Sequence, residues 1–132
     1  MNRVYIGHNN DSTDMAYLLE ILGHGVWLGL DRTTVEARDP DWRERAHMIK
    51  KLIDAGWGHR ILVGHDTMVY SGQNGKGPED PPPHMQGPYK NTNNYCFLIE
   101  QVLPLVVELG ATQAQVDKIT HDNPRRFFEN RS

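Results

Sequence analysis

The sequence predicts an α/β fold built on a parallel sheet, and two observations support that prediction. Three short apolar runs, at residues 3–8, 26–32 and 60–66, end in polar or charged residues, and a helical pattern follows each run. Alternating strands and helices are typical of parallel α/β sheets, whose functional groups lie at the carboxyl ends of the strands. We therefore expect any chemistry at the residues that end the runs: His8, Asp31, Arg32 and Asp66.

The first two helices are predicted from their apolar period and from the residues that interrupt it. Apolar residues spaced i, i+3, i+4, i+7 predict a helix over 15–22, which Ser12 or Thr13 caps and which glycines end. A second apolar face predicts a helix over 42–53 that stops at Gly56. Each of the first two strands is thus followed by its own helix.

The order changes after the third run. A long segment at 68–94, rich in glycine and proline, predicts a loop of the kind that often covers a functional site. A helix is expected over 95–109, with a kink or break at Pro104. Asn123 followed by proline predicts the N-cap of a last helix, in which Phe127 and Phe128 provide an apolar anchor.

Composition places limits on the class of protein. The chain has 132 residues, 38% hydrophobic and 23% charged, which fits one ordinary domain over 1–132. The net charge of −3, with no block of like charges, gives no basic surface for nucleic acid or an anionic membrane, so we expect neither as a partner. One cysteine, no signal-like segment and no membrane-length apolar run predict a cytoplasmic protein.

The predicted sheet is small for its type. Parallel strands buried on both faces need a neighbour or a cover at each edge, and three strands leave two edges open. A closed eight-stranded (β/α) barrel needs about 250 residues. We therefore expect either a part of a larger barrel or a chain that pairs with other chains.

Four ordered motifs resemble one known family. They are Ile-Gly-His-Asn-Asn-Asp-Ser-Thr-Asp at 6–14, Gly-Leu-Asp-Arg at 29–32, Ile-Leu-Val-Gly-His-Asp at 61–66 and Asn-Pro-Arg-Arg-Phe-Phe at 123–128. In order and spacing they resemble the C-terminal part of the phosphotriesterase family of amidohydrolases, and most closely its lactonase branch. The resemblance runs from about residue 3 to residue 128.

The resemblance implies strands six to eight of a TIM (β/α)8 barrel, with two divalent metals, expected to be Zn²⁺, at the mouth of the complete barrel. His8 and Asp66 match metal ligands of the family, and Asp66 also matches the residue that accepts a proton from the attacking metal-bound hydroxide. Asp11 and Asp31 match acids that carry this proton away. Imidazole and carboxylate at strand ends are the ligand types that metal-assisted hydrolysis requires.

The resemblance also bears on the substrate. Arg32 stands where organophosphate-hydrolysing members have a histidine, and its always charged guanidinium can hydrogen-bond a substrate oxygen but cannot relay a proton. This favours a small-molecule lactone or ester, with phosphotriesters as a further class. The segment 68–94 matches the family's substrate loop, in which Met68 and Tyr70 could line an acyl groove.

This chain matches only the C-terminal part of the family's barrel. Most of the family's metal ligands lie on the other strands. We therefore expect the isolated chain to be nearly inactive unless a complementary N-terminal barrel chain, or a homo-oligomer, completes the site. The alternative is a non-catalytic half-barrel fragment that folds by self-association. The single residues also have plainer interpretations, because Asp31 and Arg32 could form surface ion pairs and Asp11 or Asp66 could cap a helix.

Overall fold

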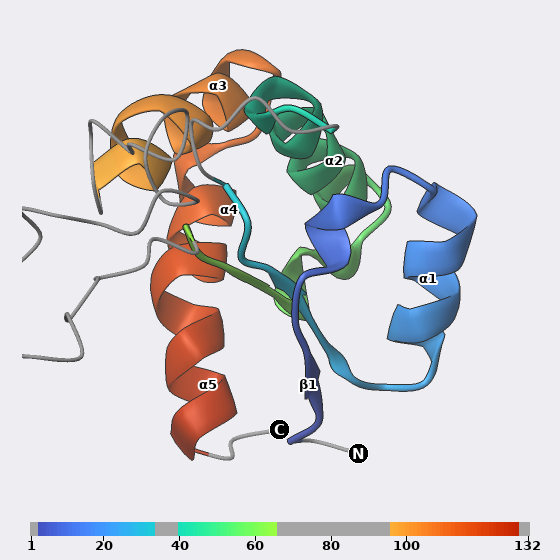
Figure 1. The fold of residues 1–132 in the computed structure, drawn as a ribbon. Coiled ribbons are helices and arrows are strands. Elements are labelled where there is room, and N and C mark those ends of the chain that lie inside the picture. Colours follow the sequence, from blue (N-terminus) through green and yellow to red (C-terminus); the bar gives the residue numbers. More distant parts are fainter. Residues whose placement is uncertain (1–2, 34–39, 66–95, 130–132) are drawn as a thin grey trace, which may run out of the picture.

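The computed structural model describes residues 3–33, 40–65 and 96–129, and Figure 1 shows their arrangement. A parallel sheet has the order β1-β2-β3, in which β1 pairs with β2 and β2 pairs with β3. Its strands are β1 (Tyr5–Ile6), β2 (Trp27–Leu30) and β3 (Ile61–Val63). The predicted α/β fold with three parallel strands is confirmed.

Helical elements surround the sheet. Those before β3 are η1 (Asn9–Asp11), α1 (Met15–Gly23), α2 (Trp42–Asp54) and the short η2 (Trp57–His59). Those after the segment 66–95 are η5 (Leu98–Val102), α3 (Leu103–Glu108), α4 (Gln113–Asp117), η6 (Lys118–Asp122) and α5 (Asn123–Glu129). None of the helices within the described ranges is long and apolar enough to cross a membrane.

The two faces of the sheet have different surroundings. Leu28, Leu30 and Ile61 are fully buried in one core with residues of α1, α2, η5 and α3. The alternate residues of β2 point to the other face, where the Phe127 ring of α5 lies 5.8 Å from the Trp27 ring, centroid to centroid. Figure 1 shows α1 and α5 on opposite sides of the strands. The face that carries Asp31 is therefore not the one that packs on the main core.

The first two helices form where they are predicted, but one cap differs. Asp14, and not Ser12 or Thr13, is the N-cap of α1, because its carboxylate accepts from the backbone N–H groups of residues 16 and 17. The α2 helix begins with a capping box, in which Asp41 and Glu44 each accept from the other's backbone N–H.

The C-terminal helices show the expected break and two wrong predictions. A π-helical turn, η5, changes to the α-helix α3 directly before Pro104. Asn123 is not an N-cap: its backbone is helical (φ −64°, ψ −50°), and η6 runs straight into α5. Its buried side chain instead donates to the carbonyls of Gly58 and Ile61, both at 2.8 Å. Phe128 is 78% exposed and is not the anchor that the sequence predicts.

Candidate functional site

Buried polar side chains bind the carboxyl ends of the three strands to one another. The Asn9 side chain donates to carbonyls at the end of β1. The Asn10 side-chain oxygen accepts from the Arg32 backbone N–H at 3.1 Å, which joins the segments after β1 and β2. The Thr33 hydroxyl donates to the Gly64 carbonyl, which joins those after β2 and β3. The strand ends therefore form one connected edge, where the sequence predicts chemistry.

His8 directly follows β1 and has an unusual backbone. Its φ of 61° lies in the left-handed region, which non-glycine residues adopt rarely and often at functional sites. Its backbone N–H donates to Asp31 Oδ1 at 2.8 Å, and its ring Nδ1 lies 3.1 Å from the same oxygen. When Nδ1 carries the proton, the Nε2 lone pair is the one that can bind a metal, as in carboxylate–histidine–metal arrangements. About half of the His8 side chain is exposed.

Asp31 has a second partner, Tyr5, whose hydroxyl donates to Oδ2. Burial acts to raise the pKa of Asp31, but the hydrogen bonds from Tyr5 and from the His8 backbone, with the charge of His8, outweigh it and hold the pKa below its ordinary value. Burial and the bond to Asp31 raise the pKa of Tyr5, so its hydroxyl keeps its proton as a donor. The Asp31 side chain also fits closely against Gly64, where a Cβ would lie 3.2 Å from that of Asp31.

Asp11, in η1, lies between two guanidinium groups. Its Oδ2 accepts from Arg32, and its Oδ1 lies 3.3 Å from an amino group of Arg45. Arg45 lies on α2, is only 4% exposed, and also donates to the carbonyls of Pro40 and Arg32. The second pair of predicted site residues, Asp11 and Arg32, is thus fixed by a residue that the sequence analysis missed.

A sequence signal for Arg45 does exist. Position 45 lies three residues after Trp42 and four before Ile49, so it falls on the apolar stripe that predicts α2. An arginine on such a stripe is buried only with partners for its guanidinium. Because Arg45 lies on the apolar stripe and not on the solvent side of the helix, it could have been predicted to be buried and to bind polar groups at the strand ends.

The structure brings four predicted site residues to the strand ends as two pairs, His8 with Asp31 and Asp11 with Arg32. Three further predicted site residues, Asp66, Met68 and Tyr70, and the loop prediction for 68–94 lie outside the described residues. The catalytic, metal-binding and substrate-binding roles remain predictions for all of them.

The donor set fits one histidine ligand of a divalent metal site. His8 offers an imidazole whose Nδ1 faces a carboxylate, which is the usual support for a metal-binding histidine. Within 3–33, 40–65 and 96–129, no group of three or more His, Cys, Asp or Glu side chains could hold a metal ion. A complete site would therefore need ligands from outside these ranges.

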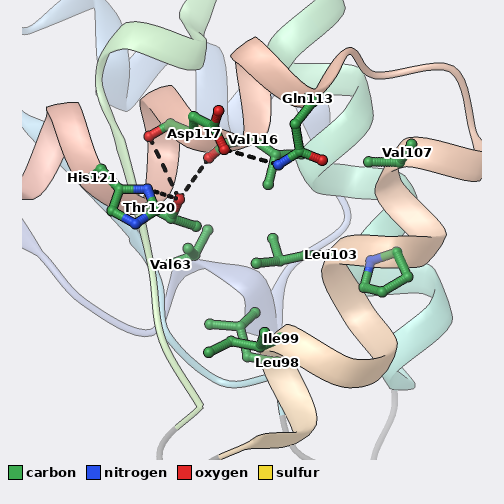
Figure 2. A pocket seen from close by; sticks show the side chains of 11 residues that line it. Val63, Leu98, Ile99, Leu103, Val107, Gln113, Val116, Asp117, Thr120 and His121 are labelled. Carbon is green, nitrogen blue, oxygen red and sulfur yellow. Dashed lines mark hydrogen bonds between the residues drawn. The ribbon is translucent and has the colours of Figure 1, made fainter.

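A separate hollow of about 720 Å³ lies beside β3, between α3 and the α4–η6 segment. Figure 2 shows apolar side chains of these elements facing it, with Thr120 and His121 at a polar rim. Its apolar lining includes Val63, Leu98 and Leu103. None of the four described site residues lines this hollow, so the predicted site and the hollow are different features.

The lowered pKa of Asp31 predicts an acid dependence of stability. A carboxyl with a depressed folded-state pKa stabilises the fold above its unfolded value and loses that contribution as pH falls through the folded value. From about pH 5 to about pH 3, wild type should therefore lose more unfolding free energy than Asp31→Asn. Urea unfolding across this range measures the difference. Asp54→Asn, which alters an i, i+4 pair with Lys50 on α2 and replaces an exposed carboxylate, is the control.

Comparisons with known proteins agree with the predicted family. The family model described as "Phosphotriesterase family" matches residues 1–128. A "Phosphotriesterase homology protein" of Mycobacterium tuberculosis is 32% identical over 130 residues, covering 98% of this chain and 37% of that protein. The solved phosphotriesterase of Mycobacterium tuberculosis matches with a TM-score of 0.81 at 31% identity, over 97% of this chain and 37% of its own.

A second solved structure, a mutant of a phosphotriesterase-like lactonase from Deinococcus radiodurans, matches with a TM-score of 0.79 at 30% identity. The match covers 96% of this chain and 39% of that one. These structures are TIM barrels, so the predicted fold class, a part of such a barrel, is confirmed. The chain spans well under half the length of the relatives that it matches.

Proposed function

Because this chain belongs to the phosphotriesterase family, we propose that it forms one wall of the active site of a metal-dependent hydrolase that cleaves lactone or ester bonds. The observation that carries the proposal is the His8–Asp31 pair: an imidazole in a left-handed backbone conformation, with Nδ1 against a carboxylate, at the end of a barrel strand. The lactone preference draws support from the lactonase named among the similar structures and from Arg32 in the Gly-Leu-Asp-Arg motif. Phosphotriesters are the second substrate class.

In this proposal His8 and Asp66 bind the metal pair, for which we propose Zn²⁺. The bound pair would acidify water and polarise the substrate carbonyl. Asp31 orients the His8 ring through the 3.1 Å contact with Nδ1. Asp66 takes up the proton that hydrolysis releases, and Asp31 and Asp11 pass it toward solvent.

The positions of Asp11 and Arg32 give each a defined task. The contacts with the guanidinium groups of Arg32 and Arg45 hold the Asp11 carboxylate in place at the strand ends. Arg32 pairs with Asp11, and its side chain is 29% exposed. In this proposal its guanidinium donates to an oxygen of the substrate. Met68 and Tyr70 would border the acyl group of the substrate.

The rest of the barrel is proposed to come from a complementary N-terminal chain. In the described part, β1 and β3 each pair only with β2, so both outer edges can accept a further parallel strand. A strand added beside β3 would continue the parallel sheet at that edge. The alternative is a non-catalytic fragment that covers these surfaces by self-association. Sedimentation of the purified chain distinguishes the two, since the alternative requires a defined homo-oligomer.

The hydrolase is tested in a hybrid barrel, in which this chain replaces the matching part of the Mycobacterium tuberculosis relative. With zinc added, we expect lactone hydrolysis that His8→Ala lowers about 100-fold or more, since the site loses a ligand. His24→Ala is the matched control, because His24 is the C-cap residue of α1 and is not one of the proposed site residues. A folded hybrid whose lactone turnover is unchanged by His8→Ala would contradict the proposal.

We also propose that the protein works in the cytoplasm. The chain has a single cysteine, Cys96, which is exposed and free. An exposed thiol is kept reduced in the cytosol. Fractionation of the native host, followed by detection of the chain, tests the location.

A further inference from the structure

Tyr5 contacts the His8–Asp31 pair but has no part in the proposed function. Its hydroxyl donates to Asp31 Oδ2 at 2.5 Å. The other carboxylate oxygen, Oδ1, accepts from the His8 backbone N–H and faces the His8 ring. Each carboxylate oxygen of Asp31 therefore has its own partner. Hydrogen bonds and close contacts connect Tyr5 through Asp31 to His8.

The surroundings of Tyr5 are shaped to keep its ring in this place. Position 29 of β2 is a glycine, and a Cβ there would overlap the Tyr5 ring. A Cβ at Gly7 would lie 3.1 Å from Asp31 Oδ2 and 3.3 Å from the same ring. The Tyr5 ring also lies 6.2 Å from that of Phe127 on α5, centroid to centroid. The ring thus contacts β2 and α5, although Tyr5 is 40% exposed, and its hydroxyl bonds Asp31.

We propose that Tyr5 is a positioning residue for His8 and acts through Asp31. A carboxylate rotates about its last torsion in a broad well, so a bond to one oxygen alone leaves its plane poorly fixed. The Tyr5 hydroxyl fixes the second oxygen and with it the plane of the carboxylate. The carboxylate then holds the His8 ring with the proton on Nδ1 and the Nε2 lone pair available to a divalent metal.

This inference rests on the proposed role of His8 as a metal ligand and adds a residue that precedes the motif at 6–14. A plainer interpretation is that Tyr5 only packs, since its ring contacts Phe127. Tyr5→Phe separates the two roles, because it keeps the ring and its packing and removes only the hydroxyl. Tyr17→Phe, at an exposed tyrosine on α1, is the matched control.

The first test needs neither metal nor activity. Nitrogen-15 NMR of the ¹⁵N-histidine-labelled chain, at a pH where the imidazole is neutral, reports which ring nitrogen of His8 carries the proton. We expect Nδ1–H to dominate in wild type and its share relative to Nε2–H to fall about threefold or more in Tyr5→Phe. Tyr17→Phe should change nothing. A His8 signal that is the same in wild type and Tyr5→Phe would overturn the inference.

Gly29→Ala is a second test of the positioning role. The alanine Cβ would displace the Tyr5 ring from Asp31, although Tyr5 itself is unchanged and still carries its hydroxyl. Gly29→Ala should shift the His8 signal in the same direction as Tyr5→Phe. An unchanged signal in a folded Gly29→Ala chain counts against the inference.

Zinc affinity of the hybrid barrel separates this inference from the proposed function. We expect Tyr5→Phe to weaken zinc binding about 10-fold, the lower end of the usual effect of supporting residues. If the hybrid is inactive but Tyr5→Phe still shifts the His8 tautomer, the proposed function fails and the positioning role stands. If His8→Ala abolishes turnover while Tyr5→Phe changes neither tautomer nor zinc affinity, the proposed function stands and the positioning role fails.

Discussion

Arg45→Ala is expected to lower the free energy of unfolding by about 3 kcal/mol, because it leaves several groups without a donor. The Arg45 guanidinium donates to the carbonyls of Pro40 and Arg32 and lies against Asp11. At 4% exposure, water cannot easily take its place. Urea unfolding monitored by tryptophan fluorescence measures the loss.

Two further variants show whether the Arg45 effect comes from the buried network. Arg45→Lys keeps the charge but not the planar fork of donors, so it should still cost about half as much as Arg45→Ala. Arg125→Ala removes an exposed i, i+4 pair with Glu129 on α5 and should cost no more than about 0.5 kcal/mol. Equal losses for Arg45→Ala and Arg125→Ala would contradict the assignment of Arg45 to a buried network.

Asn123→Leu is expected to cost about 3 kcal/mol of unfolding free energy by a similar mechanism at the other end of the sheet. The Asn123 side chain is fully buried and donates to the carbonyls of Gly58 and Ile61, where β3 begins. Leucine has a similar size but no donor, so both carbonyls lose their bond. The measurement is again urea unfolding.

Asn123→Asp tests whether the amide group itself matters. It keeps the shape but places a carboxylate against two carbonyl oxygens, so at neutral pH it should cost at least as much as Asn123→Leu. Gln113→Ala, at an exposed amide that bonds Asp117, should cost no more than about 0.5 kcal/mol. A small effect of both Asn123 variants would show that α5 does not depend on this contact.

The strands and main helices follow from sequence because their signals are local. Apolar runs and the i, i+3, i+4 stripes predict the three strands and the bounds of α1 and α2 to within one or two residues. Besides the exposed Phe128, the wrong predictions concern two side chains with a choice of partners. Asp14 competes with Ser12 for the cap of α1, and Asn123 binds carbonyls more than 60 residues away.

The site is predictable only in part for a similar reason. Strand ends and family motifs point to His8, Asp31, Asp11 and Arg32, and the structure joins these residues as two pairs. Tyr5 and Arg45 belong to regular elements, where an aromatic residue or an arginine gives no functional signal by itself. Only the spatial pairing of β1, β2 and α2 shows that Tyr5 contacts Asp31 and that Arg45 contacts Asp11.

The proposal that this chain forms one wall of a two-metal site is tested by measuring its zinc content. The purified chain and the hybrid barrel are incubated with zinc, separated from free metal and analysed by elemental mass spectrometry. We predict about two zinc ions per hybrid barrel and well under one per isolated chain, because a tight zinc site needs three or more protein ligands. A folded hybrid barrel that retains no zinc, or an isolated chain that retains two, would contradict the account.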